Sequence, residues 1–160
     1  MAQKNAIQLL KEDHRKVKDL LSQLVNTTTR AEKTRRQLLD KIELELSVHT
    51  RLEEEIFYPA FRKAGNSDYL KLYFEALEEH RAVEALVLPD LKKTEPGSEN
   101  FSGRAKVLKE LIEHHAEEEE KDMFKKARQS MSKEELAELG TRMSERKQEL
   151  LKERQASRAA

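Results

Sequence analysis

Four stretches of this chain repeat an apolar residue every three or four positions, and in each stretch a histidine takes one of the positions expected to hold a hydrophobic side chain. This spacing keeps the apolar side chains on one face of an α-helix, so each stretch must bury that face against the others. The apolar positions are Ile7, Leu10, Val17, Leu21 and Leu24 in the first stretch, Leu39, Ile42, Leu46, Ile56 and Ala60 in the second, Leu70, Tyr73, Leu77, Val87 and Leu91 in the third, and Phe101, Ala105, Leu108, Ile112 and Met123 in the fourth. The histidines that interrupt them are His14, His49, His80 and His115. The pattern predicts four helices whose histidines point into a common core.

The breaks between these stretches predict an all-α fold. The 160 residues include only 4 glycines and 3 prolines, too few for the many turns of a β-rich fold. Helices are expected over residues 5–26, 31–59, 68–89 and 102–128. Asn5 should cap the first, Asp68 should cap the third, and Pro59 should kink or end the second. A fifth helix should begin after a capping box at Ser132 and fray from about Lys152. We therefore expect an antiparallel up-down-up-down four-helix bundle over residues 1–130, followed by an additional C-terminal helix and frayed tail over residues 131–160.

Three of the histidines have a glutamate four residues later, on the same helical face. Side chains at that spacing lie one turn apart, where an imidazole nitrogen and a carboxylate oxygen can bind one ion. Burying these ionisable groups without a neutralising partner would cost roughly a few kcal/mol each. The predicted metal ligands are therefore His14, His49, Glu53, His80, Glu84, His115 and Glu119. Four imidazoles and three carboxylates suit two carboxylate-bridged ions better than one, because a single ion rarely takes more than about six such ligands.

The remaining polar and aromatic residues near these positions have simpler interpretations. His114 is also followed by a glutamate, Glu118, but it points about 100° away from His115 around the helix. We therefore place His114 at the edge of the core. We expect four acids to be solvated surface charges: Asp13, Glu54, Glu117 and Glu120. We expect three aromatic residues to pack in the core or to form the wall of a small-ligand pocket: Phe57, Tyr58 and Tyr73.

The composition excludes several classes of protein. No cysteine is present, so disulfide frameworks, thiolate metal sites and thiol chemistry are excluded. The 31 Lys and Arg residues balance 31 Asp and Glu residues, which gives no reason to expect nucleic acid or an anionic membrane as a partner. No apolar run approaches the roughly 20 residues that a membrane-spanning helix needs. We expect a cytoplasmic protein, either a monomer or a homodimer.

The positions of the histidines and glutamates resemble those of the hemerythrin-like proteins, also called the HHE cation-binding family. The resemblance spans about residues 5–130. It is carried by Asp13-His14, by the segment from His49 through Glu53 and Glu54 to Pro59, by His80, and by the segment from His115 through Glu119 and Glu120 to Phe124. It implies that the bundle over residues 1–130 holds two non-haem iron ions, with Glu53 and Glu119 as bridging carboxylates and the histidines as terminal ligands. Members of the family bind O₂, sense oxygen or iron, or handle peroxide and nitric oxide.

One position departs from the oxygen carriers of that family. They have a second histidine one turn after the ligand of the third helix, where this chain has Glu84. A carboxylate ligand adds negative charge and favours the ferric state, so we expect a sensor or scavenger that reacts with O₂, peroxide or another small ligand, with no catalytic residues beyond the metal ligands. Two alternatives stay open: a non-catalytic zinc, manganese or iron storage module, and a ferritin-like oxidase. The oxidase is disfavoured because its Glu-x-x-His pairs do not occur on the apolar faces.

Overall fold

The computed structural model describes residues 3–160, which form helices and short connections with no strand among them. The all-α prediction is therefore confirmed for these residues. The elements are α1 (Ala6–Val25), α2 (Glu32–Leu52), η1 (Glu53–Phe57), α3 (Tyr58–Ala64), α4 (Ser67–Ala82), η2 (Val83–Val87), α5 (Leu88–Lys93), α6 (Glu99–Glu118), η3 (Glu119–Met123), α7 (Phe124–Ser130) and α8 (Lys133–Ala159), where η denotes a π-helical turn.

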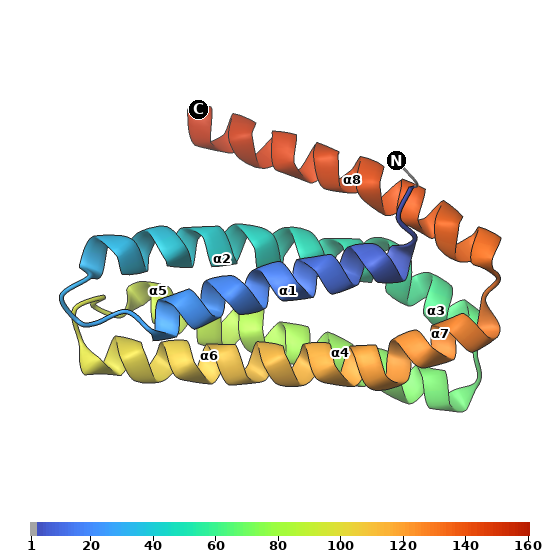
Figure 1. Ribbon diagram of the computed structural model, residues 1–160, viewed down its shortest axis with the longest axis horizontal. Coiled ribbons are helices and arrows are strands. Elements are labelled where there is room, and N and C mark those ends of the chain that lie inside the picture. Colours follow the sequence, from blue (N-terminus) through green and yellow to red (C-terminus); the bar gives the residue numbers. More distant parts are fainter. Residues whose placement is uncertain (1–2) are drawn as a thin grey trace.

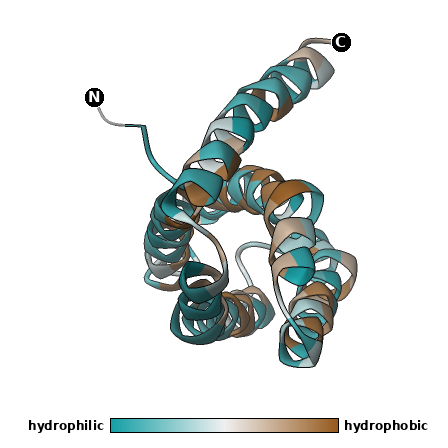
Figure 2. Cartoon of the chain, turned by 90° about the vertical axis from the view of Figure 1, so that its right-hand side faces the viewer, coloured by the Kyte–Doolittle hydropathy of each residue, from teal (hydrophilic) through white to brown (hydrophobic). Residues whose placement is uncertain are grey.

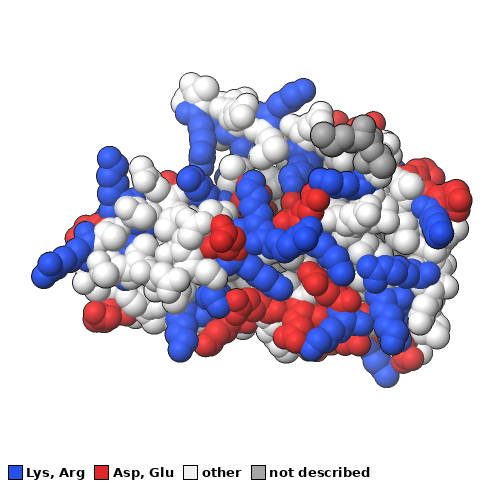
Figure 3. All heavy atoms as spheres, viewed as in Figure 1, with Lys and Arg blue, Asp and Glu red and all other residues white. Residues whose placement is uncertain are grey.

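The π-helical turns join α-helices end to end, so that α2–η1–α3, α4–η2–α5 and α6–η3–α7 form three continuous arms beside α1. The helices α1, α2, α4 and α6 lie side by side along the long axis of the molecule, and successive arms run in opposite directions (Figure 1). α1 packs against both α2 and α6. On the face that Figure 3 presents, basic and acidic side chains are interspersed, and acidic ones gather toward α6.

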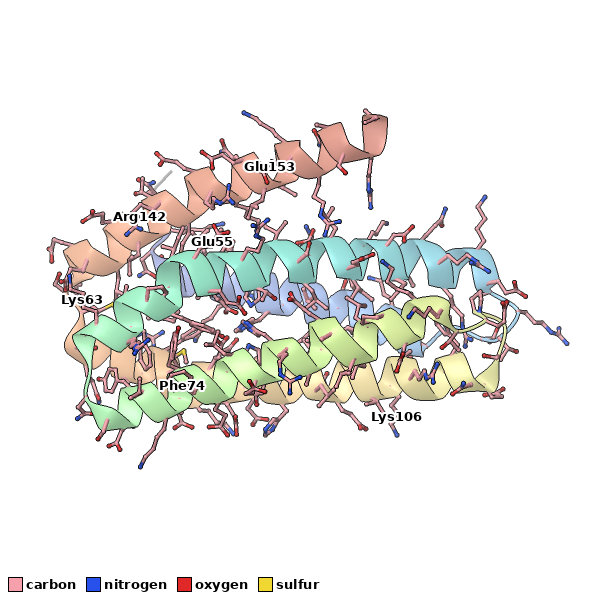
Figure 4. The ribbon with its side chains drawn as sticks, turned by 180° about the vertical axis from the view of Figure 1, so that it is seen from behind. Glu55, Lys63, Phe74, Lys106, Arg142 and Glu153 are labelled. Atoms are coloured by element: carbon pink, nitrogen blue, oxygen red, sulfur yellow. The ribbon has the colours of Figure 1, made fainter. Side chains whose placement is uncertain are left out.

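The last helix, α8, packs across the end of the arms at which α1 begins, and its C-terminal half extends away from the bundle (Figure 1). Its Gly140 allows close approach to the start of the chain, because a Cβ atom there would lie 2.3 Å from the carbonyl oxygen of Lys4. Arg146 donates a hydrogen bond to Glu55 at 2.7 Å, and Glu55 lies on the side of its arm that faces α8 (Figure 4). The tail that was expected to fray is helical as far as Ala159.

Two of the three predicted capping residues, Asn5 and Ser132, begin their helices. The third predicted helix is capped by Asn66 and not by Asp68, whose backbone N–H donates to the Asn66 side chain at 3.1 Å. The side chain of Asn5 accepts a hydrogen bond from the backbone N–H of Gln8 at 3.0 Å, and Ser132 accepts one from the backbone N–H of Glu135 at 3.1 Å. Caps of this kind each stabilise a helix by about 1 kcal/mol. No helix within residues 3–160 is both long enough and apolar enough to cross a membrane.

The helix that contains Pro59 does not end there. The backbone N–H of Tyr58 donates to the carbonyl of Glu53, five residues earlier, and this wider turn continues into α3. Pro89 follows the second π-helical turn in the same way, but no proline follows η3. The common factor is the place: each π-helical turn begins three or four residues after a core histidine. Such turns inside α-helices are frequent at functional sites.

The apolar core has two parts, one on each side of a layer of buried polar residues. The part nearer α8 includes Ile7, Leu10, Leu52, Phe57 and Phe124. The other part includes Val17, Leu21, Ile42, Leu91 and Leu108. Seen along the arms, hydrophobic residues lie mainly on the sides of the helices that face one another (Figure 2).

Candidate metal centre

Six of the seven predicted ligands meet in the polar layer between the two parts of the core. They are His14, His49, Glu53, His80, His115 and Glu119, and each is buried. They come from α1 and from the three arms, so that every helix around the axis contributes. The ligand atoms fall into two groups, His14 with His49, Glu53 and Glu119, and Glu53 with His80 and His115, and within each group they lie within 4.8 Å of one another.

Glu53 belongs to both groups because its two oxygens face different histidines. Its Oε1 lies 3.0 Å from Nε2 of His49 and 3.9 Å from Nε2 of His14. Its Oε2 lies 3.1 Å from Nε2 of His80 and 4.0 Å from Nε2 of His115. One carboxylate thus spans two pairs of imidazoles, which is the arrangement that a bridge between two ions requires.

Glu119 occupies a second position between the pairs. Its Oε2 lies 3.1 Å from Nε2 of His14 and 3.6 Å from Nε2 of His115. Its Oε1 accepts a hydrogen bond of 2.5 Å from the hydroxyl of Tyr58. The carboxylate therefore has one oxygen toward the imidazoles and one held by a phenol.

Tyr58 is a residue of the centre that the sequence pattern did not identify. Its hydroxyl also lies 3.3 Å from Oε2 of Glu53 and 3.2 Å from Nε2 of His80. In an α-helix a residue five positions after Glu53 would point about 140° away from it. The π-helical turn η1 closes with a hydrogen bond between these two residues, which brings the tyrosine over the glutamate. The proline after Tyr58 was the only signal of that turn, and it indicated a break.

A carboxylate from a neighbouring helix faces the other ring nitrogen of every core histidine. Asp13 Oδ2 lies 3.5 Å from Nδ1 of His49, and Glu54 Oε1 lies 2.9 Å from Nδ1 of His80. The remaining two contacts join Glu79 Oε2 to Nδ1 of His115 at 2.5 Å and Glu120 Oε1 to Nδ1 of His14 at 2.9 Å. A carboxylate at this nitrogen fixes the orientation and tautomer of a histidine whose Nε2 binds metal.

The contacts of these four acids were not predicted from the sequence. Asp13 was expected at the surface but is buried, whereas Glu54 is exposed as expected, Glu120 is half-buried, and Glu79 was not among the predicted residues. Each acid neighbours a predicted ligand or bridging residue in the sequence and contacts the histidine of the next arm. Asp13 also accepts a hydrogen bond of 2.5 Å from Nζ of Lys147. Lys147 belongs to α8, so the last helix contacts one of the acids around the centre.

The carboxylates and imidazoles also shift one another's pKa values. Burial disfavours the charged form of His49, but the negative charges of Glu53 and Asp13 outweigh burial and raise its pKa to about 10. Burial would raise the pKa of Glu53, yet the surrounding histidines hold it well below its ordinary value. Burial and then the charges of Glu119 and Glu53 raise the pKa of Tyr58 well above its usual range, so this hydroxyl keeps its proton. Without a cation, the centre is therefore neutralised by protonated histidines.

Several buried atoms of the centre have no hydrogen-bond partner within residues 3–160. They are Nε2 of His14, Nδ1 and Nε2 of His49, Oε1 of Glu53 and Oε2 of Glu119. Buried polar atoms without partners normally cost about 1–3 kcal/mol each. Nitrogen and oxygen lone pairs that converge without aligned hydrogen bonds fit the coordination of cations.

Glu84, the seventh predicted ligand, is not brought into this cluster. The turn η2 begins at Val83, three residues after His80, whereas η1 and η3 begin at Glu53 and Glu119, four residues after their histidines. Val83 therefore takes the inward position and is 6% exposed, while Glu84 is exposed. Burial of part of this side chain raises its pKa, and Thr50 is its hydrogen-bonding neighbour.

A cavity of about 320 Å³ adjoins the centre. Its apolar lining includes Val17, Leu46, Val83, Leu111 and Ile112, and the four core histidines also line it. Its size is enough for a small molecule next to the imidazoles.

Known proteins share both this sequence pattern and this fold. The family model of the hemerythrin HHE cation binding domain matches residues 5–127. The uncharacterized protein Rv2633c of Mycobacterium tuberculosis is 31% identical over 147 residues, which cover 91% of this chain and 87% of that protein. The chain also resembles the crystal structure of a hemerythrin HHE cation binding domain-containing protein, the Rv2633c homolog from Mycobacterium kansasii, with a TM-score of 0.79 and 32% identity over 92% of this chain and 87% of that one.

A relative of another kind matches over part of its length. A DNA nickase of Nostoc sp. is 27% identical over 138 residues, which make up 86% of this chain but 37% of that protein. The match to the family model over residues 5–127, together with the fold and identity shared with the mycobacterial proteins, means that this chain belongs to the hemerythrin HHE cation-binding domain family.

Proposed function

We propose that this protein holds two iron ions in an antiparallel four-helix bundle, with α8 as an additional helix, and that the ions react with O₂ or peroxide. The observation that carries the proposal is the position of Glu53, whose two oxygens face two separate pairs of histidines. His14 and His49 would hold one ion, and His80 and His115 the other. Glu53 and Glu119 would bridge them.

The donor set fits this assignment. Imidazoles and carboxylates suit iron, and they also suit zinc and manganese. The two groups of converging ligand atoms share Glu53. Five buried nitrogen and oxygen atoms of the histidines and glutamates lack hydrogen-bond partners within the described chain. Both facts support a centre that binds two cations, and they argue against a centre in which the histidines and glutamates only neutralise one another.

Bound iron would supply the electrons that O₂ or peroxide accepts. The chain itself would orient the imidazoles through Asp13, Glu54, Glu79 and Glu120, whose carboxylates face the Nδ1 atoms. The apolar walls of the cavity would limit bulk water and admit a small ligand. Tyr58 keeps its proton and donates a hydrogen bond to Glu119 at the centre. A fixed hydrogen-bond donor there would stabilise negative charge that develops on oxygen, which favours a reaction such as peroxide reduction over storage alone.

Glu84 lies outside the cluster, so it would not supply the added negative charge that favours the ferric state over reversible O₂ binding. The proposed peroxide reaction therefore depends on Tyr58, whose hydroxyl contacts both carboxylates of the centre.

Metal analysis and anaerobic iron loading test the proposal. We expect about two irons per chain and a visible absorption band that changes when O₂ or peroxide is added. Zinc or manganese in the purified protein, together with failure of ferrous iron to bind, would instead support the non-catalytic metal-binding module. Iron that binds at one ion per chain would contradict the bridging role of Glu53.

A further inference from the structure

A third group of metal-ligating side chains lies outside the buried centre, between α4 and α6. Nε2 of His114 is 3.3 Å from Oε1 of Glu118 and 3.8 Å from Oε1 of Glu79. One ligand atom from each of these residues lies within 4.8 Å of the other two. His114 is exposed, and the two glutamates are half-buried.

Glu79 connects this group to the centre. One of its oxygens faces His114, and the other contacts Nδ1 of the core ligand His115 at 2.5 Å. Both Glu79 and His114 line the cavity that adjoins the centre. The same cavity reaches His14 and His49, whose buried Nε2 atoms have no hydrogen-bond partner in the described chain. A continuous space therefore runs from the surface group to unpartnered ligand atoms.

The charges around the group also favour a cation. Among residues 3–160, neither Glu79 nor Glu118 forms an ion pair with a lysine or arginine. Other acids on α6 do: Glu113 pairs with Lys109 at 2.6 Å, and Glu117 pairs with Lys121. Glu78, which lines the cavity beside Glu79, also pairs with an arginine, Arg81, at 2.8 Å. Glu79 and Glu118 therefore differ from these neighbouring acids in having no lysine or arginine partner within the described residues.

We propose that Glu79, His114 and Glu118 form a third, exchangeable site for a divalent cation at the mouth of the cavity, and that ferrous iron binds there before it passes to the buried centre. One imidazole and two carboxylates suit ferrous iron, and an exposed site with three protein ligands leaves other positions for water, so the ion can leave. The binding site stands on its own contacts, whereas the delivery role rests on the function proposed above.

The first test measures cation binding. The buried centre is filled with Zn²⁺, excess ion is removed by gel filtration, and Mn²⁺ is titrated into isotope-labelled protein while amide NMR signals are followed. We expect paramagnetic broadening confined to residues near 79, 114 and 118. The double variant His114→Ala/Glu118→Gln should need at least about tenfold more Mn²⁺, because two of three ligands are lost. Glu117→Gln, an exposed charge on the same helix, is the matched control and should behave like the wild type.

The second test measures delivery. Anaerobic ferrous iron is mixed with the metal-free protein, and filling of the centre is followed as the loss of iron that a chromogenic ferrous chelator can take up at successive times. The double variant should fill several-fold more slowly and reach the same final iron content, while Glu117→Gln should fill at the wild-type rate.

Each outcome decides one part of the proposal. Absence of localised broadening in the wild type would overturn the site, and equal filling rates would overturn the delivery role. Equal effects of Glu117→Gln and the double variant would mean that general surface charge is responsible, which also overturns the proposal. If the protein binds no iron but Mn²⁺ still broadens the same signals, the proposed function and the delivery role fail while the site stands.

Discussion

Replacing Glu53 with glutamine preserves the shape of the most buried acid of the centre and removes its charge. We expect this change to lower the unfolding free energy of the metal-free protein by about 3–4 kcal/mol at pH 7. The magnitude follows from His49, whose pKa is lowered by burial but raised by Glu53 and Asp13, from 6.5 to about 10. A histidine that gains about three pKa units above pH 7 on folding stabilises the folded state by about 4 kcal/mol. Asp13 remains in the variant, so most of this stabilisation is lost, but not all of it.

The pH dependence has a definite sign. Because the folded-state pKa of His49 is the raised one, its contribution is fully present below pH 6.5 and is lost as the pH rises through about 10. Urea unfolding of the metal-free wild type and variant across this range should give a difference in free energy that shrinks at high pH. Glu113→Gln, which changes a half-buried acid at the surface of α6, is the control and should cost less than about 0.5 kcal/mol. A Glu53→Gln effect below about 1 kcal/mol at pH 7, or one independent of pH, would refute the assigned charge interaction.

Three further substitutions separate the roles of individual residues. Tyr58→Phe should leave the iron content unchanged and slow peroxide consumption about tenfold or more, measured by stopped-flow absorbance, because the hydrogen-bond donor to Glu119 is lost. An unchanged rate would exclude that role. Lys147→Met removes the contact that holds Asp13 and should weaken metal binding by up to about tenfold in chelator competition, since this acid orients a ligand histidine; unchanged affinity would mean that α8 does not influence the centre. Glu84→Gln should leave the metal content unchanged by elemental analysis, because this exposed side chain lies outside the cluster, and loss of metal would return Glu84 to the ligand set.

The apolar repeat predicted the helices and most of the residues that meet in the core. Leu70 is an exception: it is 37% exposed, and its neighbour Tyr69 is buried instead. A histidine at a position of that repeat points inward regardless of small errors in helix bounds, which is why His14, His49, His80 and His115 come together as expected. Whether a glutamate four residues after the histidine also points inward depends on where the π-helical turn begins. Glu84 differs from the other two because η2 begins one residue earlier relative to its histidine, and a regular α-helical spacing cannot express such a shift.

The roles of Tyr58 and of the acids that contact the histidines could not be predicted from the pattern of one helix. Tyr58 meets Glu53 only because a π-helical turn separates them, and the sequence gives no period for a single such turn. Acids such as Glu54 and Glu120 lie beside the inward-facing residues, and they appear solvated when one helix is considered alone. Their role depends on the histidine of the adjacent arm, so it becomes visible only when the helices are packed together.

The four contacts between acids and histidines link the helices in a closed ring. Asp13 of α1 contacts the histidine of α2, Glu54 of η1 contacts that of α4, Glu79 of α4 contacts that of α6, and Glu120 of η3 contacts that of α1. No arm can therefore slide or rotate by itself without disturbing two imidazoles, its own and that of its successor. Damage to one acid should be felt first in the following arm, and a transplant of this centre into another scaffold would have to carry all four arms together.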